Sequence, residues 1–453
     1  MPPPISWSAL ADAQVGVWGL GVEGQATLRR LRALGVSPVL VDDTPDPGSG
    51  PGAVLATSSG GLDALASCDV VVKSPGISRY RPEVGQLEAA GVAVCGGLGL
   101  FLEDADPDRV VCITGTKGKS TTTAIAVHLL DALGYRARAG GNIGHPPWDP
   151  GVTPGVNADD EPDYWIIETS SFQVPDLTRG PRVVAVTSLS PDHLDWHGSV
   201  ERYYEDKLSL CAKPGVGVAL ADGSDAALRA NAALLGPHLR WVGADDVRRD
   251  AAWSASLGLP GPHNARNAAL ARAVLEALGI PEARDDQRLA VAAGGFEGLP
   301  SRCHSLGRVG SVEFVDDSLS TNVLPTQAAL AAYETRPVAL LVGGHDRGVD
   351  YTALGAALAT RRAPSLVVTM PDNGPRIGDA VRAATSGRVE VVDAPSLEAA
   401  VSSAFEWAGS RDADGADPVV LLSPAAPSFG RFADYRARAA AFAEAAARCG
   451  TLR

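Results

Sequence analysis

The stretch 110–129 constrains the fold of this chain more than any other. An apolar run of strand length, Arg109 to Ile113, is followed by a glycine-rich loop and then by a helical stretch. The loop consists of Gly115, Thr116, Lys117, Gly118, Lys119, Ser120 and Thr121. In this arrangement the loop N–H groups and the positive end of the helix surround a phosphate, Lys119 adds a cation, and the Ser120 or Thr121 hydroxyl can bind Mg²⁺. A full P-loop has glycine where this chain has Ile113, so the motif is a shortened variant.

Apolar runs of strand length alternate with Ala- and Leu-rich helical stretches along all 453 residues, which predicts an α/β protein with parallel sheets. At roughly 150 residues per domain, the chain has room for about three domains. We place them at 1–105, 106–305 and 306–453, with an acidic linker at Glu103 to Asp108 and a surface loop at Asp149 to Pro162. The first block is expected to open with a strand at Val15 to Trp18 and a helix from Gln25. The third block is expected to begin with a strand pair at 312–315 and 338–342.

Composition argues against several classes of protein. Lys and Arg number 39 against 53 Asp and Glu, and the net charge of −14 repels nucleic-acid backbones and anionic membranes. No run of 18 apolar residues occurs, and the N-terminus does not resemble a signal peptide. The six cysteines are far apart and suggest neither a disulfide framework nor a zinc site. We therefore expect a cytoplasmic protein that binds neither nucleic acid nor a membrane.

Two further segments of the middle block carry groups suited to metal binding and acid–base chemistry. Glu168 ends an apolar run that starts at Trp165, and Asp192, His193 and Asp195 follow another run at 183–187. The carboxyl ends of parallel strands lie at one edge of a sheet, so these side chains and the glycine-rich loop are expected to meet in one crevice. Lys207 lies in a helical stretch, and its local context indicates an ordinary surface lysine.

A second glycine-rich turn follows the first predicted strand. Gly19, Gly21 and Gly24 have the spacing of a dinucleotide-binding loop, and Asp42 and Asp43 lie about 20 residues further on. Taken alone, this pattern fits NAD as well as any other diphosphate. An NAD-dependent oxidoreductase would, however, leave the loop at 115–121 unexplained.

Eleven segments, in order, resemble the Mur ligases, the ATP-dependent amino-acid-adding enzymes of peptidoglycan synthesis, and most closely the branch that adds glutamate. They are GLGVEG (19–24), SPGIS (74–78), GTKGKSTTT (115–123), GNIG (141–144), ETSSFQ (168–173), SPDHLDWHG (190–198), GPHNARNAALA (261–271), GLPSR (298–302), DDSLSTN (316–322), GGHDRG (343–348) and LLSPAAPS (421–428). The resemblance implies a Rossmann-like first domain for the UDP substrate, a central P-loop ATPase domain and a Rossmann-like C-terminal domain for glutamate.

The resemblance also implies roles for single residues. ATP would be bound by the loop 115–121 together with Asn267, Arg302 and Asp317. The UDP substrate would be bound by Gly19, Gly21, Gly24, Asp43, Ser74, Asn142 and His193. Glutamate would be bound by Thr321, Arg347, Ser428 and Phe429. Two Mg²⁺ ions would be held by Ser120, Thr121, Glu168, His193 and a carbamylated Lys207, and the catalytic residues would be Lys119, His193 and Lys207.

Two departures from the family pattern fall in the expected glutamate site. Leu319 stands where D-glutamate-adding members usually carry lysine, and Pro427 stands where a small residue is usual. A branch of the family adds L-glutamate and relies on a separate epimerase, and the departures favour that branch over ordinary D-glutamate addition. A folylpolyglutamate-type ligase and a nucleotide-dependent switch remain as alternatives. We expect a monomer that uses UDP-N-acetylmuramoyl-L-alanine, ATP and glutamate.

Overall fold

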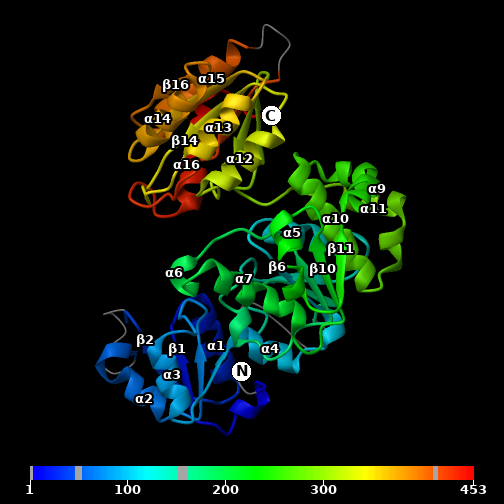
Figure 1. Cartoon of the computed structure of the whole chain (residues 1–453), viewed down its shortest axis with the longest axis vertical. Coiled ribbons are helices and arrows are strands. Elements are labelled where there is room, and N and C mark those ends of the chain that lie inside the picture. Colours follow the sequence, from blue (N-terminus) through cyan, green and yellow to red (C-terminus); the bar gives the residue numbers. More distant parts are fainter. Residues whose placement is uncertain (1–3, 46–53, 151–160, 412–416) are drawn as a thin grey trace. The chain divides into compact units, whose positions relative to one another are not determined.

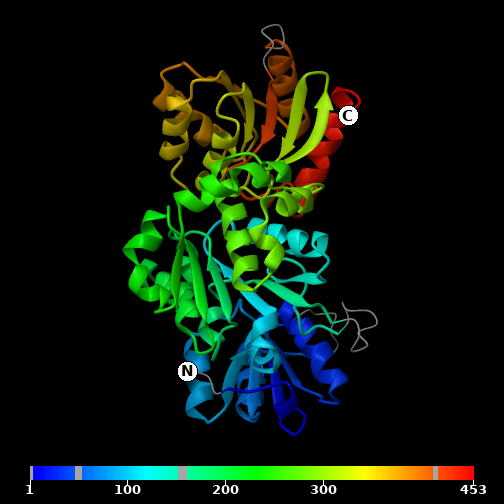
Figure 2. The same cartoon turned by 90° about the vertical axis from the view of Figure 1, so that its right-hand side faces the viewer.

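The computed structural model describes residues 4–45, 54–150, 161–411 and 417–453 (Figure 1). The chain forms two compact units. Unit 1 comprises Met1–Gly258 and Ala265–Phe296, and unit 2 comprises Leu259–Asn264 and Glu297–Arg453. Figure 2 shows the strands and helices of each unit from a second direction. Three largely parallel sheets flanked by helices confirm the predicted fold class. The domain boundaries stay a prediction.

The first sheet of unit 1 has the order β3-β2-β1-β4-β5, and all its strands are parallel. The strands are β1 (Val15–Trp18), β2 (Val39–Asp42), β3 (Leu55–Ala56), β4 (Val70–Lys73) and β5 (Ala93–Gly96). The helices are α1 (Val22–Ala33), α2 (Leu62–Ala66), α3 (Pro82–Ala89) and α4 (Gly97–Asp104). The strand order reverses between β1 and β4, so the loops after these two strands border a crevice. The predicted first strand is confirmed, whereas the helix begins at Val22 rather than Gln25.

The second sheet of unit 1 is also parallel, with the order β11-β10-β9-β6-β8-β7. Its strands are β6 (Val110–Thr114), β7 (Ala137–Gly141), β8 (Tyr164–Glu168), β9 (Val183–Val186), β10 (Val218–Asp222) and β11 (Leu239–Val242). Its helices are α5 (Lys119–Ala132), α6 (Leu194–His197), α7 (Val200–Leu208), α8 (Ala226–Ala230), α9 (Ala244–Ser254), α10 (Pro262–Ala277) and α11 (Asp286–Ala293). Every residue of β6 is buried, as expected for a strand with neighbours on both sides. The loops after β6, β8 and β9 are therefore adjacent.

The sheet of unit 2 has the order β12-β13-β17-β14-β15-β16, in which only β12 runs antiparallel to its neighbour. Its strands are β12 (His304–Val309), β13 (Val312–Asp316), β14 (Val338–Val342), β15 (Ser365–Thr369), β16 (Glu390–Asp393) and β17 (Val419–Leu422). Its helices are α12 (Val323–Ala332), α13 (Thr352–Thr360), α14 (Gly374–Thr385), α15 (Leu397–Gly409) and α16 (Tyr435–Cys449). The expected pairing of β13 with β14 is wrong, because the fully buried β17 lies between them.

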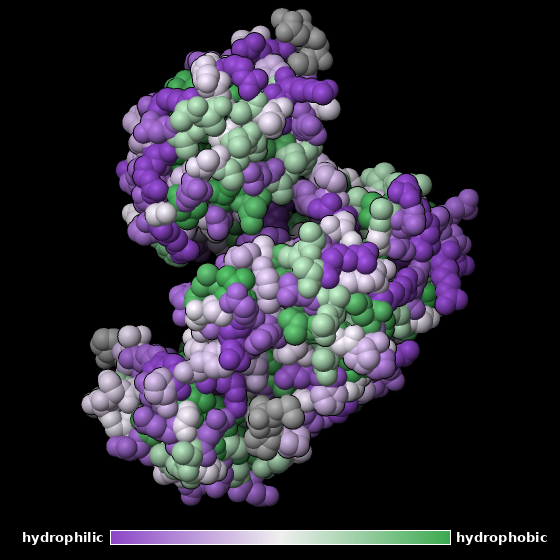
Figure 3. All heavy atoms as spheres, in the orientation of Figure 1, coloured by the Kyte–Doolittle hydropathy of each residue, from purple (hydrophilic) through white to green (hydrophobic). Residues whose placement is uncertain are grey.

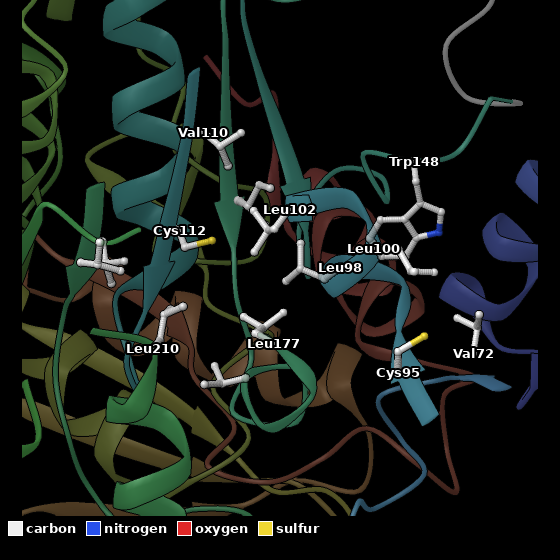
Figure 4. Close-up of a cluster of buried hydrophobic side chains, with 14 of the residues drawn as sticks. Val72, Cys95, Leu98, Leu100, Leu102, Val110, Cys112, Trp148, Leu177 and Leu210 are labelled. Carbon is white, nitrogen blue, oxygen red and sulfur yellow. The ribbon is translucent and has the colours of Figure 1, made fainter. Parts of the chain in front are cut away.

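The two sheets of unit 1 share one hydrophobic core (Figure 4). The cluster joins the first sheet to the second through α4, and its members include Val72, Cys95, Leu98, Leu100, Leu102, Val110 and Cys112. Because α4 runs to Asp104 and a short 3₁₀ turn covers Pro107–Arg109, the predicted linker at 103–108 is largely helical. Burial of the three leucines of α4 fixes this segment between the sheets.

The described residues expose few large apolar side chains. Hydrophilic side chains cover much of the face visible in Figure 3, with apolar ones scattered among them. The large apolar side chains that are exposed lie on separate elements and are Val22, Tyr80, Leu194, Val291, Leu324 and Phe429. All six cysteines are unpaired. In the part of the chain described, no helix combines the length and apolar character needed to cross a bilayer. Most of the surface loop expected at 149–162 falls on residues 151–160, outside the described ranges.

Candidate active site

The glycine-rich loop between β6 and α5 is shaped by two close approaches. Gly115 and Gly118 have φ values of 135° and 89°, which L side chains rarely adopt. A Cβ at Gly118 would lie 2.6 Å from Oδ1 of Asn267 on α10, and one at Gly115 would clash with Oγ1 of Thr187 after β9. The structure therefore brings Asn267 against the loop. Nζ of Lys119 donates to the Gly115 and Thr116 carbonyls at 2.9 and 3.1 Å, which holds the ammonium close to the loop.

Glu168 lies at the carboxyl end of β8, next to β6 in the sheet. It is 4% exposed, and its Oε2 has no hydrogen-bond partner among the described residues. The backbone N–H of Asn142 donates to the carbonyl of Glu168 at 3.1 Å, so the two predicted residues are neighbours. A buried carboxylate oxygen without a donor costs free energy, and a bound cation would remove that cost.

His193 precedes α6 with a positive φ of 52°, and its ring contacts Phe172 with centroids 4.8 Å apart. Partial burial lowers the pKa of His193, and the nearby Lys207 and Lys119 lower it further, while Asp192 acts in the opposite direction. A lowered pKa favours the neutral imidazole, which is the form that binds metals. The side chain of His193 remains half exposed.

Lys207 on α7 is 2% exposed, so the surface lysine expected from its local context is wrong. Its Nζ donates to the carbonyl of Gly115 at 3.0 Å and lies 5.0 Å from the centre of the Tyr203 ring. Burial holds the pKa of Lys207 well below its usual value, and repulsion from Lys119 adds to this. The amine thus lies directly at the phosphate loop in an environment that favours its neutral, nucleophilic form.

The donors gathered around the loop suit Mg²⁺ better than a soft metal. In the described ranges no group of three or more His, Cys, Asp or Glu could hold a metal without help from other residue types. The available oxygen donors are the carboxylate of Glu168 and the hydroxyls of Ser120 and Thr121, with the His193 imidazole as a nitrogen donor. This predominance of oxygen fits Mg²⁺, and the unpartnered Oε2 of Glu168 is the structural observation that supports a cation here.

A buried network of side-chain hydrogen bonds, which the sequence did not reveal, supports α7. Nδ1 of His197 lies 2.6 Å from Oδ2 of Asp206, and its Nε2 lies 2.9 Å from Oγ of Ser171. The other oxygen of Asp206 accepts from the Tyr80 hydroxyl of the first sheet's domain at 2.5 Å. Because Asp206 immediately precedes Lys207, this hydrogen-bond network fixes the position of that lysine. The one sequence signal was the second histidine in SPDHLDWHG.

The turn after β1 is the second candidate binding site of unit 1. Gly19 has a φ of 87°, and a Cβ at Gly24 would clash with the carbonyl oxygen of Gly19, so the turn is tight. Oγ of Ser74, after β4, donates to that same carbonyl at 2.6 Å. Gly21 is exposed, with open space where a side chain would be. The predicted residues Gly19, Gly21, Gly24 and Ser74 are therefore together at the point where the strand order reverses.

Asp43 lies beside this turn and lines a cavity of about 490 Å³. It accepts from Oγ1 of Thr57 at 2.8 Å and from Nη1 of Arg81 at 2.5 Å, and the Arg81 guanidinium stacks 5.0 Å from the Trp18 ring centre. Burial alone would raise the pKa of Asp43, but the hydrogen bonds from Arg81 and Thr57 outweigh it and lower that pKa. The neighbouring Asp42 instead accepts from the N–H of Leu20 and stabilises the turn.

The remaining predicted residues belong to unit 2. Both Asp317 oxygens accept hydrogen bonds, from the N–H of Cys303 and from Oγ of Ser423, and burial raises the pKa of Asp317 to about 6 against the opposing charge of Arg302. Ser428 and Phe429 line a cavity of about 190 Å³. Thr321 and Arg347 are not among its lining residues. The cavity is lined instead by Arg438, a buried arginine that the sequence analysis did not single out.

Comparison with known proteins gives a consistent result along the chain. Residues 113–248 match the profile of the Mur ligase middle domain. The chain is 40% identical to the UDP-N-acetylmuramoyl-L-alanine--L-glutamate ligase of Xanthomonas euvesicatoria pv. vesicatoria, over 97% of this chain and 96% of the relative. It is also 40% identical to the protein of the same name from a Micromonospora species, over 97% of both.

Solved structures show the same fold at low sequence identity. UDP-N-acetylmuramate-alanine ligase MurC from Thermotoga maritima aligns with a TM-score of 0.53 at 17% identity, covering 97% of this chain and all of that one. MurF ligase from Thermotoga maritima, solved in complex with ADP, aligns with a TM-score of 0.54 at 15% identity, covering 97% of each.

Proposed function

Because this chain belongs to the Mur ligase family, we propose that it joins L-glutamate to the L-alanine carboxylate of UDP-N-acetylmuramoyl-L-alanine. As a member of that family it is an ATP-dependent ligase that forms a C–N bond. The observation that carries the proposal is the match, along nearly the whole of both chains, to relatives named as L-glutamate ligases. Leu319, in place of the usual lysine, supports an amino-acid site that differs from that of the D-glutamate enzymes.

The first step makes the carboxylate reactive. A carboxylate is a poor electrophile, so the L-alanine carboxylate oxygen attacks the γ-phosphorus of ATP, the bond to the β-phosphate bridging oxygen breaks, and an acyl phosphate and ADP result. Lys119, whose ammonium donates to two loop carbonyls, would offset the charge of the transferring phosphoryl group. Mg²⁺ at Glu168, His193 and the loop hydroxyls would supply further positive charge and orient the phosphates.

The second step forms the amide. The glutamate amine attacks the acyl carbonyl carbon, and the tetrahedral intermediate collapses with loss of inorganic phosphate and of the amine proton. Water would hydrolyse the acyl phosphate, so the site must exclude it until glutamate is bound. ATP and the UDP substrate would lie at the two candidate sites of unit 1, the glycine-rich loop and the turn after β1, which share one hydrophobic core.

We propose that Lys207 is carbamylated. Its neutral amine would add to carbon dioxide with loss of one proton, which converts a buried neutral amine into a carbamate anion. Two observations support this: Nζ is buried at the loop, and it lies close enough to the Lys119 ammonium to be affected by it. The anion would attract the Lys119 ammonium and could bind the metal near His193. A monomeric enzyme and a separate epimerase acting on the product are further predictions.

The test is an ADP-release assay with UDP-N-acetylmuramoyl-L-alanine and either glutamate enantiomer, with the product identified by mass and chirality. We expect ADP release that depends on all three substrates and a clear preference for L-glutamate. Lys119→Ala serves as the catalytic control, because it removes the cation and should abolish turnover without unfolding the chain. A clear preference for D-glutamate would refute the choice of enantiomer and return the chain to ordinary D-glutamate addition.

A further inference from the structure

Arg438 is a buried cation with no acidic hydrogen-bond partner in the part of the chain that the structure describes. It lies in the first turn of α16 and is 1% exposed. Nη1 donates to the carbonyl of Ala426 at 3.0 Å and Nη2 to that of Ser318 at 2.8 Å. Nε has no partner among the described residues. The guanidinium is thus held by two neutral carbonyls, and its charge is not neutralised through these contacts.

Such a charge is costly to bury, so its presence needs an explanation. Burial lowers the pKa of Arg438 to about 10, and Asp316 acts in the opposite direction, so the side chain is still charged at neutral pH. Asp316 itself already accepts hydrogen bonds from Ser301 and Ser318. A structural brace between two carbonyls would not by itself require a full positive charge.

The position of Arg438 links this charge to a cavity. The side chain lines the cavity of about 190 Å³ that also contains Gly343, Gly344, Ser428 and Phe429. A Cβ on Gly344 would lie 3.2 Å from Nη1, so the guanidinium lies directly beneath the turn after β14. The two carbonyls it binds belong to the loops after β13 and β17. Ligands of open parallel sheets bind at this end of the strands.

The other arginines near this end of the sheet are less suited to select an acidic ligand. Arg431 also lines the cavity, but it is exposed and forms an ion pair with Asp372 at 3.1 Å. Arg347, the carboxylate-binding residue predicted from the sequence, is exposed and does not line the cavity. Screening by water weakens both of these charges, whereas a buried charge keeps more of its effect.

We propose that Arg438 is the specificity-determining cation for the side-chain carboxylate of the amino-acid substrate, and that it takes over the electrostatic role of the lysine that Leu319 replaces. This inference rests on the proposed function, because it assumes that glutamate is the amino acid added. The unpartnered Nε and the field of the guanidinium favour an acidic ligand in the cavity over its neutral amide analogue.

The experiment compares kcat/KM for glutamate with kcat/KM for glutamine, which has the same shape without the charge. Arg438→Met should lower the value for glutamate roughly 10- to 100-fold, as expected for a lost hydrogen bond to a charged group, and change that for glutamine by less than about threefold. Arg438→Lys keeps the charge and should retain part of the discrimination. Arg436→Met is the matched control, because Arg436 lies two residues away on α16 but is exposed.

A purely structural role for Arg438 predicts a different result, since a distorted site would lose activity toward both amino acids alike. An unchanged glutamate-to-glutamine ratio in Arg438→Met, with wild type active on glutamate, would overturn this inference and leave the proposed function intact. Should the methionine variant not fold, Arg438→Gln carries the same test, because its amide can still donate to a carbonyl. A wild-type enzyme that ligates neither glutamate enantiomer would overturn both proposals.

Discussion

Removal of the Asp176 carboxylate is predicted to destabilise unit 1 strongly. Asp176 follows β8 in the second sheet and binds two cations of the first sheet's domain: Nζ of Lys73 at 2.5 Å and Nη1 of Arg79 at 2.9 Å. The side chains of Lys73 and Asp176 are 0% and 2% exposed, so water hardly screens the pair. In Asp176→Asn the buried lysine loses its neutralising charge, and a neutral amide and the carbonyl of Ile77, at 3.0 Å, remain as its acceptors.

The magnitude follows from that burial. Breaking a buried ion pair by removing one partner typically costs about 3–5 kcal/mol, because the other charge remains buried and unpaired. Arg79 retains Glu88 and the carbonyl of Val94, so we expect a value near the lower end, about 3 kcal/mol. The surface pair Arg136–Asp163, 60% and 36% exposed, provides the control, and Asp163→Asn should cost less than about 1 kcal/mol.

Urea unfolding of the full chain, followed by tryptophan fluorescence, measures the loss in free energy of unfolding for Asp176→Asn and for Asp163→Asn. A second comparison removes both charges at once: Lys73→Met with Asp176→Leu should recover much of the stability, because no unpaired charge is left buried. If Asp176→Asn lowered the free energy of unfolding no more than Asp163→Asn does, the Lys73–Asp176 pair would not link the two sheets.

Three further predictions concern single residues. Lys207→Ala should be nearly inactive and partly rescued by short carboxylic acids that replace the carbamate; full activity without them would refute carbamylation. Burial raises the pKa of Glu23 from its usual 4.5 to about 7, against the hydrogen bond from Gln173, so the stability that proton binding contributes is present below pH 4.5 and lost as the pH rises through 7. Glu23→Gln should abolish this pH-dependent loss in urea titrations, and an unaltered profile would contradict the assignment. Leu319→Lys should lower kcat/KM for L-glutamate and admit some D-glutamate, which the chirality of the product would reveal.

The elements around the glycine-rich loop were predictable because their signals are local. The apolar run before Gly115, the glycines with positive φ and the helix from Lys119 all follow from neighbouring residues. The adjacency of Glu168 to this loop was also predictable, since the ends of parallel strands share one edge of a sheet.

The features that were missed depend on distant contacts. Lys207 lies in a helix whose sequence looks solvated, and it is buried only because α7 packs against the loop through the carbonyl of Gly115. Arg438 lies in an Ala-rich helix, where an arginine normally faces water. The central place of β17 in its sheet is set by the return of the last strand of the chain, which no local pattern encodes.

The core around α4 also fixes the chemical reactivity of two thiols. Cys95 and Cys112 belong to that core, one from each sheet of unit 1, and burial raises the pKa of each to about 12. The thiolate is the form that attacks alkylating reagents, so neither sulfur reacts at neutral pH until the core around it opens. The alkylation rates of the two cysteines therefore report when each sheet opens. Equal alkylation rates mean that the two sheets separate and open in a single event. Faster labelling at one cysteine identifies the sheet that opens first.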